Sequence, residues 1–510
     1  MPFLDGAEDL VFMRVGAIYP DGAKIVVRHP VKNETEHVLQ LLWREARPEK
    51  AWERGPTLNL TESRDWVGTV QLGGLWPSTE YEYTLATDEG NHIRDFPKPL
   101  RFKTFPDPRL GRGSQFRFIA SSCITPNFPY GGPTERKTIH GFDLMSEYLD
   151  PHSTKDVSPA PPMEFILFLG DFIYADVPIY WGNAKEAYRR LYRRNYQSPS
   201  FRKVYEKYPI VHAYDDHEII NNFSGEGNSS LQPYENAEHA FNLYNGEPNY
   251  SPFSPGHHYY NFSYGDTAFF IMDTRRYRSA PVDDLSTRTM LGDDQLYALY
   301  DWLSKVNTTS TFKFIVSSVP LTSLWGHDAA TDSWAGFPTE KSALLSAFHS
   351  VPNVFVISGD RHEFAAIEFN SAHGHTVHEF STSPLNMFYI PFIRTLKQQS
   401  DQTVEVYNQT LNTDAENTTI FEAAPPVPLE RVFKYIPTGN HKWSTFEIDT
   451  READKPMLRL SVLVDGDVAY NWTYVGKPLK VKTASALGLF TSGGIEELVR
   501  KFGMNPRKWF

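Results

Sequence analysis

The sequence of 510 residues lacks the features that mark several common classes of protein. It contains one cysteine, Cys123, so it cannot form an internal disulfide framework. No apolar run approaches the roughly 18 to 20 residues that cross a bilayer, so the sequence predicts no membrane segment. It also has no Gly-x-Ser-x-Gly elbow and no P-loop. These absences exclude a serine hydrolase of the elbow type and a P-loop nucleotide-binding protein.

Positive charge is also scarce. The chain has 50 Lys and Arg against 62 Asp and Glu, for a formal net charge of −12. Phosphate-backbone affinity comes from clustered Lys and Arg, so we expect no general nucleic-acid binding. A small phosphorylated substrate needs only a local positive site. With 40% hydrophobic residues, the chain can build two or three domains, and we expect a monomer.

Asn-x-Ser/Thr sequons are more frequent than chance predicts. This excess favours a glycosylated protein, secreted or on the cell surface, although a polar-rich sequence is the alternative. The first ten residues, MPFLDGAEDL, have no charged and apolar signal regions, so we expect that a signal segment is not present in this chain. The sequons begin at Asn33, Asn59, Asn222, Asn228, Asn249, Asn261, Asn307, Asn408, Asn417 and Asn471.

The first part of the chain, residues 1–106, is predicted to be an all-β sandwich. Short runs rich in β-formers are separated by turn signals such as Pro-Asp-Gly. Residues 75–83 (LWPSTEYEY) are similar to the tyrosine corner of fibronectin type III and immunoglobulin-like domains, in which a Tyr hydroxyl bonds to nearby backbone. Residues 106–114 (PDPRLGRGS) have the composition of a linker.

From about residue 115, apolar runs alternate with polar or helical stretches, which indicates an α/β domain over residues 107–478. Residues 185–208 and 293–306 have helical spacing, and residues 458–475 read as a hairpin. Residues 479–510 are predicted to be a helical tail. The predicted strands lie in residues 116–124, 163–171, 208–216, 267–275, 312–320 and 353–361.

Several of these strands end in residues that could bind metal. Such strand ends meet at one edge of a sheet, and carboxylates gathered there repel one another unless a cation neutralises them. The residues are Cys123; Asp171, Tyr174 and Asp176; Asp215, Asp216 and His217; and Asp360 and His362.

Each of these residues also has an ordinary structural interpretation. A Gly-Asp step is usually a turn, an Asp-Asp-His-Glu run suits a helix N-terminus, and a lone His or Cys can lie in the core. Three carboxylate sites that each follow an apolar strand make coincidence less probable than a shared function.

The segments GDFIYAD, YDDHEIINN, MDTRRYR and VISGDRHEF, with SSC at residues 121–123, resemble the signature segments of the PhoD-like alkaline phosphatase/phosphodiesterase family. That family is related in fold to calcineurin-like and purple acid phosphatases. The resemblance implies a four-layer αββα sandwich that holds Fe³⁺ and Ca²⁺, preceded by the β-sandwich. It also implies metal-dependent hydrolysis of a small phosphate monoester or diester by a metal-bound hydroxide or oxo group.

The resemblance assigns roles to individual residues. Ferric ligands would be Cys123, Asp171 and Tyr174, joined by Asp360, with Asp171 bridging to calcium. Calcium would take Asp215, Asp216 and Asn221, although Asp216 stands where purple acid phosphatases have Asn. His362 and His217 would be ligands or proton carriers near the leaving group, with Asp176 orienting its neighbours. Arg275 and Arg276 could contact phosphate, or could form ion pairs with Asp273 or a neighbouring loop; Arg361 is a weaker candidate.

Two other functions compete with an alkaline phosphatase. One is a phosphodiesterase of the phospholipase D type or one acting on wall teichoic-type polymers. The other is a non-catalytic binding protein on the same scaffold, although Cys123, Asp171, Asp216 and His362 are all present. A further hypothesis is that the tail covers the site and restricts access, in which case deleting residues 490–510 should raise activity on bulky diesters.

Overall fold

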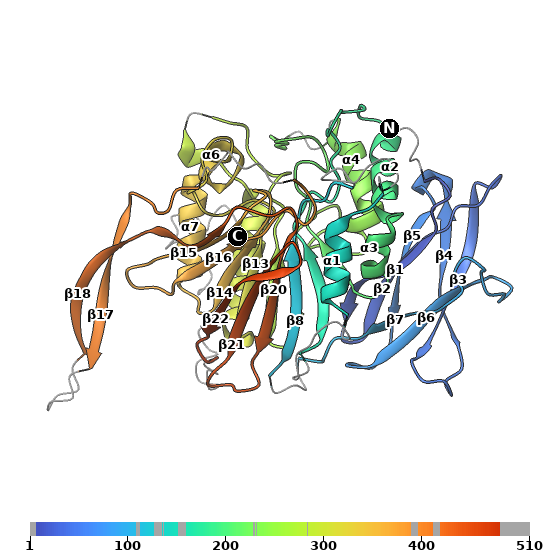
Figure 1. Ribbon diagram of the computed structural model, residues 1–510, viewed down its shortest axis with the longest axis horizontal. Helices are drawn as coiled ribbons and strands as arrows, with labels where there is room; N and C mark the ends of the chain where they lie inside the picture. The colour runs from blue at the N-terminus through green and yellow to red at the C-terminus, as the bar shows by residue number, and fades with distance from the viewer. Residues whose placement is uncertain are drawn as a thin grey trace.

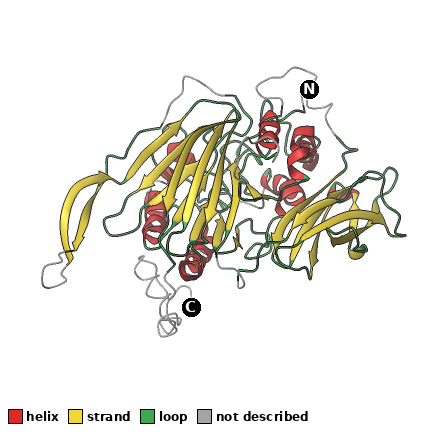
Figure 2. Ribbon diagram, turned by 60° about the horizontal axis from the view of Figure 1, so that its bottom comes forward, coloured by secondary structure: helices red, strands yellow, loops and turns green. Residues whose placement is uncertain are grey.

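A computed structural model describes most of the chain, and Figures 1 and 2 show its arrangement. No helix in the described ranges is long and apolar enough to span a membrane. Side chains are not described for residues 407–424. The described residues are 7–108, 113–126, 135, 137–150, 160–227, 230, 232–282, 284–388, 396–411 and 419–479.

The N-terminal region is all β, as the sequence predicts. The Tyr81 hydroxyl accepts a hydrogen bond from the backbone N–H of Trp76 at 2.8 Å, which confirms the tyrosine corner. Domain boundaries at residues 106 and 478 stay predictions. One sheet contains β1 (Phe12–Tyr19), β2 (Gly22–Arg28) and β5 (Val67–Gly73), and the other contains β4 (Glu53–Thr61), β3 (Glu36–Glu45), β6 (Glu80–Thr87) and β7 (Leu100–Lys103).

Two mixed sheets form the centre of the molecule. In the first, β8, β9 and β10 run parallel and the other strands are antiparallel. Its order is β10 (Ile210–His212), β9 (Met163–Phe168), β8 (Gln115–Ser121), β20 (Lys442–Asp449), β21 (Met457–Val464) and β22 (Asp467–Val475).

In the second sheet, β12, β13, β14 and β16 are parallel. Its order is β11 (Tyr260–Tyr264), β12 (Thr267–Ile271), β13 (Phe312–Val316), β14 (Val354–Ser358), β16 (Val377–Ser381), β15 (Phe364–Phe369) and β19 (Glu430–Ile436).

Aromatic side chains fill the space between the two sheets. Phe118 stacks on Phe165 and Phe446, with centroids 5.3 and 4.8 Å away, and meets Phe269 and Phe314 edge-on. Separate apolar clusters join each sheet to the helices on its outer face, so the predicted αββα sandwich is confirmed. The helices are α1 (His140–Tyr148), α2 (Lys185–Tyr196), α3 (Pro199–Tyr205) and α4 (Tyr234–Phe241) on one side, and α5 (Gly292–Thr309), α6 (Ala329–Asp332) and α7 (Pro338–His349) on the other.

The six predicted strands and the C-terminal hairpin are present. The predicted helix over residues 185–208 is two helices, α2 and α3, because Pro199 has no N–H to continue α2 and suits the first turn of α3. The sequence did not indicate the two-stranded arm formed by β17 (Thr403–Leu411) and β18 (Thr419–Pro428), which projects from the body in Figure 1.

The predicted tail over residues 479–510 lies outside the described residues except for Leu479. Before it, Lys477 donates its backbone N–H to Asn353 Oδ1 at 2.8 Å, at the start of β14. The polar residues Asp360 and His362 follow the opposite end of that strand. The hypothesis that the tail covers the site therefore remains a prediction.

Candidate metal centre

Parallel strands of both central sheets deliver predicted site residues to the same end of the sandwich. Cys123 follows β8, Asp171 follows β9, and Asp360 and His362 follow β14. These four residues have left-handed φ angles of 64°, 56°, 70° and 57°. Non-glycine residues rarely adopt this conformation, and such strained residues cluster at functional sites. The backbone turns sharply where each polar side chain is placed.

Gly170 allows the loop after β9 to lie close to the loop after β10. Its φ is 109°, and a Cβ at this position would lie 2.6 Å from Asp215 Cβ. Only glycine fits both the backbone angle and the contact. The Gly-Asp step therefore lets the loop after β9 approach the loop after β10.

The first group of possible ligands is Cys123, Asp171 and His362, whose donor atoms lie within 4.8 Å of one another. Cys123 Sγ is 3.4 Å from Asp171 Oδ2. The Tyr174 hydroxyl is 3.0 Å from both Asp171 Oδ2 and His362 Nε2. Met387 packs against Cys123 and Tyr174 and shields the group. The structure thus gathers a thiol, a carboxylate, a phenol and an imidazole.

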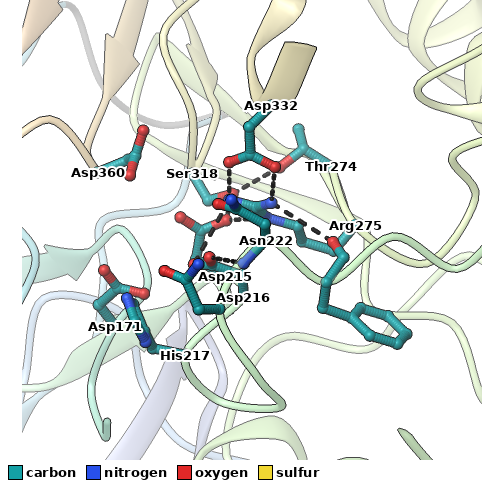
Figure 3. A network of polar contacts seen from close by, with 12 residues as sticks. Asp171, Asp215, Asp216, His217, Asn222, Thr274, Arg275, Ser318, Asp332 and Asp360 are labelled. Atoms are coloured by element: carbon teal, nitrogen blue, oxygen red, sulfur yellow. Dashed lines mark hydrogen bonds and ion pairs between the residues drawn. The ribbon is translucent and has the colours of Figure 1, made fainter. Parts of the chain in front are cut away.

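A second group contains Asp171, Asp216 and His217, again with donor atoms within 4.8 Å. His217 Nδ1 lies 2.7 Å from Asp176 Oδ1, which leaves Nε2 for the group, and its ring packs 4.2 Å from that of Tyr174. Figure 3 shows His217 beside Asp171, with Asp216 next to them. Because Asp171 belongs to both groups, the geometry suits two adjacent cations with one shared carboxylate.

The electrostatics of both groups favour either protonated side chains or a bound cation. Burial raises the pKa of Asp171 well above its ordinary value, and Asp216 and Asp215 raise it further although His217 opposes them. Burial and Asp171 likewise raise the pKa values of the Cys123 thiol and the Tyr174 phenol. Deprotonated ligands would be stable here only with a positive ion to neutralise them.

The pKa values of His362 and His217 are shifted in opposite directions. Burial lowers the pKa of His362 to about 3, so its imidazole is neutral and can coordinate a metal. Burial alone would lower the pKa of His217, but Asp171, Asp176 and Asp216 outweigh it and raise that pKa to about 10.

Unpaired oxygens provide a direct test of whether a metal fits. Asp171 Oδ1 and Asp215 Oδ2 are buried and have no hydrogen-bond partner. Asp216 Oδ1 has no hydrogen bond either, but it lies 3.4 Å from Arg275 Nη2. Buried carboxylate oxygens are normally satisfied, because leaving them unpaired is costly. The two unpaired oxygens beside a thiol and imidazoles therefore fit cation binding, and these donor types suit the two cations that the family resemblance implies.

Arg275 lies behind this centre, in a buried network. Its Nη1 and Nη2 contact the Asp332 carboxylate at 2.7 and 3.1 Å, and its Nε donates to Asp215. Ser318 also donates to Asp215 at 2.7 Å. The Arg275 side chain is 0% exposed, so the expected phosphate contact is corrected: its donors already serve carboxylates. The alternative of an ion pair holds, and its partners are Asp215, Asp216 and Asp332.

Arg276 points elsewhere. Its Nη1 donates to the carbonyl of Gly256, and its guanidinium lies 5.6 and 5.5 Å from the ring centroids of Tyr234 and Tyr277. The described contacts therefore place it against aromatic rings and not against either ligand group.

Replacing Arg275 by Met is expected to lower the free energy of unfolding by about 3 to 5 kcal/mol, because buried Asp215 would lose its cationic partner and Asp332 would keep only Arg278. Denaturant unfolding of matched metal-loaded samples measures this, and Arg276→Met, at a partly exposed position, should change stability by less than about 1 kcal/mol. Unchanged stability together with a raised KM would instead restore Arg275 as a substrate contact.

Three predicted ligands lie outside both groups. Asp215 uses one oxygen for Arg275 and Ser318, as above. Asn221 is exposed and contributes its backbone N–H to Asp176 at 3.0 Å, whereas the next residue, Asn222, donates its backbone N–H to Asp216. Asp360 approaches Cys123 through its carbonyl, at 3.9 Å from Sγ, and its carboxylate faces Arg361. Their roles as ligands stay predictions.

Glu218 was not among the predicted site residues, although it is the last residue of the Asp-Asp-His-Glu run. This buried carboxylate accepts the backbone N–H groups of Asp171, Phe172 and Asp215, at 3.0, 2.5 and 2.7 Å. It therefore ties the loop after β9 to the loop after β10. The sequence signal for Glu218 was its position directly beside the candidate residue His217. No sequence signal indicated Asp332, because it lies 57 residues from its partner Arg275.

Comparison with known proteins identifies the family of the chain. The family model described as PhoD-like phosphatase matches residues 153–423. The chain is 25% identical over 340 residues to alkaline phosphatase D of Bacillus subtilis (strain 168), which covers 58% of this chain and 52% of that protein. This chain thus spans about half the length of the Bacillus protein.

Two solved structures share the fold. A structure of PhoD matches with a TM-score of 0.63 at 17% identity, and the match covers 91% of this chain and 90% of the PhoD chain. A purple acid phosphatase from yellow lupin (Lupinus luteus) seeds has a TM-score of 0.57 at 14% identity, covering 92% and 74%. At these identities the likeness concerns the fold alone.

Proposed function

The chain belongs to the PhoD-like phosphatase family, and from this premise we propose that it hydrolyses phosphate esters at a centre of two cations. The observation that carries the proposal is the sharing of Asp171 between two groups of possible ligands. Two cations a few ångströms apart can bind the attacking and the leaving oxygens of one phosphoryl group.

We assign Fe³⁺ to the group of Cys123, Asp171, Tyr174 and His362. Phenol and thiol side chains with a neutral imidazole favour a ferric ion over an alkaline-earth ion, which prefers oxygen. Calcium is assigned to the Asp171 and Asp216 side, where carboxylate oxygens dominate. Asp215, Asn221 and Asp360 remain further candidate ligands. When bound, the metals would lower the pKa of water and neutralise charge on the phosphoryl oxygens.

The residues of the chain itself arrange and protonate the substrate. Asp176 holds His217 Nδ1 at 2.7 Å and so fixes the ring with Nε2 toward the centre. We assign His217 the role of proton donor to the leaving alkoxide, because its Nδ1 is paired with Asp176 and its Nε2 is left to face the centre. Asp171 and Tyr174 hold the ligand geometry, while Glu218 keeps the two loops together.

We also propose a secreted or cell-surface, glycosylated monomer that acts on a small organic phosphate. Exposure supports modification at some sequons: Asn33, Asn59, Asn261 and Asn471 are exposed. Asn249 is different, since its buried side chain bonds the backbone of His212 at 2.9 and 2.8 Å. Asn222, although exposed, lies beside Asp216, where a glycan would obstruct the site.

Hydrolysis of p-nitrophenyl phosphate and of bis(p-nitrophenyl) phosphate tests the function. We expect turnover of at least one ester, loss of activity after chelation, and recovery on adding Ca²⁺ to protein that retains iron. A higher kcat/KM for the diester would favour the phosphodiesterase alternative. No turnover of either ester by metal-loaded, folded protein would leave the non-catalytic binding protein as the better account.

A further inference from the structure

Arg361 lies between two residues of the centre. It follows Asp360 and precedes His362 directly after β14, in the part of the loop with left-handed backbone angles. Its side chain is 14% exposed, in contrast to the fully buried Arg275. The guanidinium therefore lies beside the Asp360 carboxylate and is still partly open to solvent.

The hydrogen-bonding capacity of Arg361 is incompletely used. Nη2 donates to Asp328 Oδ1 at 3.1 Å, and Nη1 lies 3.6 Å from Asp360 Oδ2, too far for a good hydrogen bond. Nε is buried and has no hydrogen-bond partner. An arginine offers five N–H donors in a planar fork that matches two phosphate oxygens. Arg361 thus has donors to spare beside the centre.

Two neighbours hold the guanidinium without saturating it. Its carbon lies 5.6 Å from the ring centroid of Trp325, which orients the plane through a cation–π contact. Asp328 is 53% exposed, so its ion pair with Arg361 is partly solvated and weak. A dianionic phosphate would attract the same guanidinium more strongly than this single exposed carboxylate.

We propose that Arg361 binds a phosphoryl oxygen of the substrate, and that Trp325 is a positioning residue that orients its guanidinium. This inference rests on the proposed hydrolysis of phosphate esters and identifies the cation that recognises them. It replaces Arg275 and Arg276 in that role, because the donors of Arg275 are taken by carboxylates and Arg276 is directed at Gly256 and two tyrosines.

Binding of inorganic phosphate tests the proposal independently of turnover. In metal-loaded protein, phosphate should change the tryptophan fluorescence, because it draws the guanidinium from the Trp325 ring, and Trp325→Phe should remove that change. Titration calorimetry should show phosphate affinity lower by about tenfold or more in Arg361→Ala. Arg276→Ala is the matched control and should bind phosphate like the wild type.

Kinetics separate phosphate binding from a structural effect. Arg361→Ala should raise KM and the inhibition constant for phosphate by similar factors, while iron content and thermal midpoint stay at wild-type values. Arg361→Lys should recover part of the affinity, and Asp328→Asn should keep it within about threefold, since that pair is solvated.

The outcomes distinguish a failure of the role proposed for Arg361 from a failure of the proposed phosphate-ester hydrolysis. Turnover by wild type with unchanged phosphate affinity in Arg361→Ala would overturn the role of Arg361 and leave the proposed function intact. Loss of metal or of folding in both Arg361→Ala and Arg361→Lys would show a structural role and overturn the proposal as well. If the wild type neither binds phosphate nor hydrolyses either ester, the proposed function fails, and this inference fails with it.

Discussion

Replacing Asp171 by Asn should reduce kcat/KM for phosphate-ester hydrolysis by about a thousandfold or more. Asp171 is the one residue that belongs to both ligand groups. Its replacement removes a negative charge from both cations at once, and each tenfold loss corresponds to about 1.4 kcal/mol of transition-state stabilisation. Loss of several kcal/mol is the usual scale for metal-ion catalysis.

The same substitution should leave the metal-free fold intact. Burial and neighbouring carboxylates disfavour the Asp171 anion, so a neutral amide of the same size relieves repulsion. The backbone N–H of residue 171 would still donate to Glu218. Thermal unfolding of the metal-free proteins should therefore give a midpoint for Asp171→Asn that is equal to or above that of the wild type.

Asp449→Asn is a suitable control, because that carboxylate lies at the end of β20 away from the centre and pairs with the exposed Arg451. Its activity should match the wild type. An Asp171→Asn enzyme that keeps more than about a tenth of wild-type activity would show that the two groups do not act as one centre.

Replacing Cys123 by Ser should remove the iron and with it the activity. The Cys123 side chain is completely buried and lies 3.4 Å from Asp171 Oδ2. A serine hydroxyl is a much poorer anionic ligand than a thiolate, and its shorter bond withdraws the donor atom. We expect loss of the visible charge-transfer band from thiolate and phenolate ligands, whereas calcium bound through Asp216 should be retained more fully.

The alternative for Cys123 is a small core residue without a ligand role. In that case Cys123→Ser would cost stability, since a hydroxyl would be buried in place of a thiol, yet iron content and the visible spectrum would not change. Measuring the spectrum, the iron content and the unfolding midpoint on one sample separates the two roles.

The sequence predicted most of what short-range patterns can encode. The runs before Cys123, Asp171 and Asp360 are continuous and apolar, as expected for strands buried on both faces, so the two-sheet sandwich and the strand-end position of these residues could be expected. The tyrosine corner was equally visible, because its residues lie within nine positions.

Contacts between distant segments were not predictable in this way. Arg275 follows the strand β12 much as Asp171 follows β9, so its position suggested a phosphate contact. Its role depends on Asp332, on the short helix α6, which no local pattern links to it. Asn221 donates its backbone N–H to Asp176, whereas Asn222 donates its backbone N–H to Asp216. This difference depends on the left-handed backbone of Asn222, with φ of 58°, which periodicity does not specify.

Metal analysis of the purified wild-type protein tests the central claim most directly. Plasma mass spectrometry should find iron near one atom per chain together with calcium, in a protein whose visible absorption shows a charge-transfer band. Such a result would establish that Cys123, Tyr174 and the shared Asp171 form a metal centre. A folded protein, prepared without chelators, that contains neither metal nor visible absorption would contradict it.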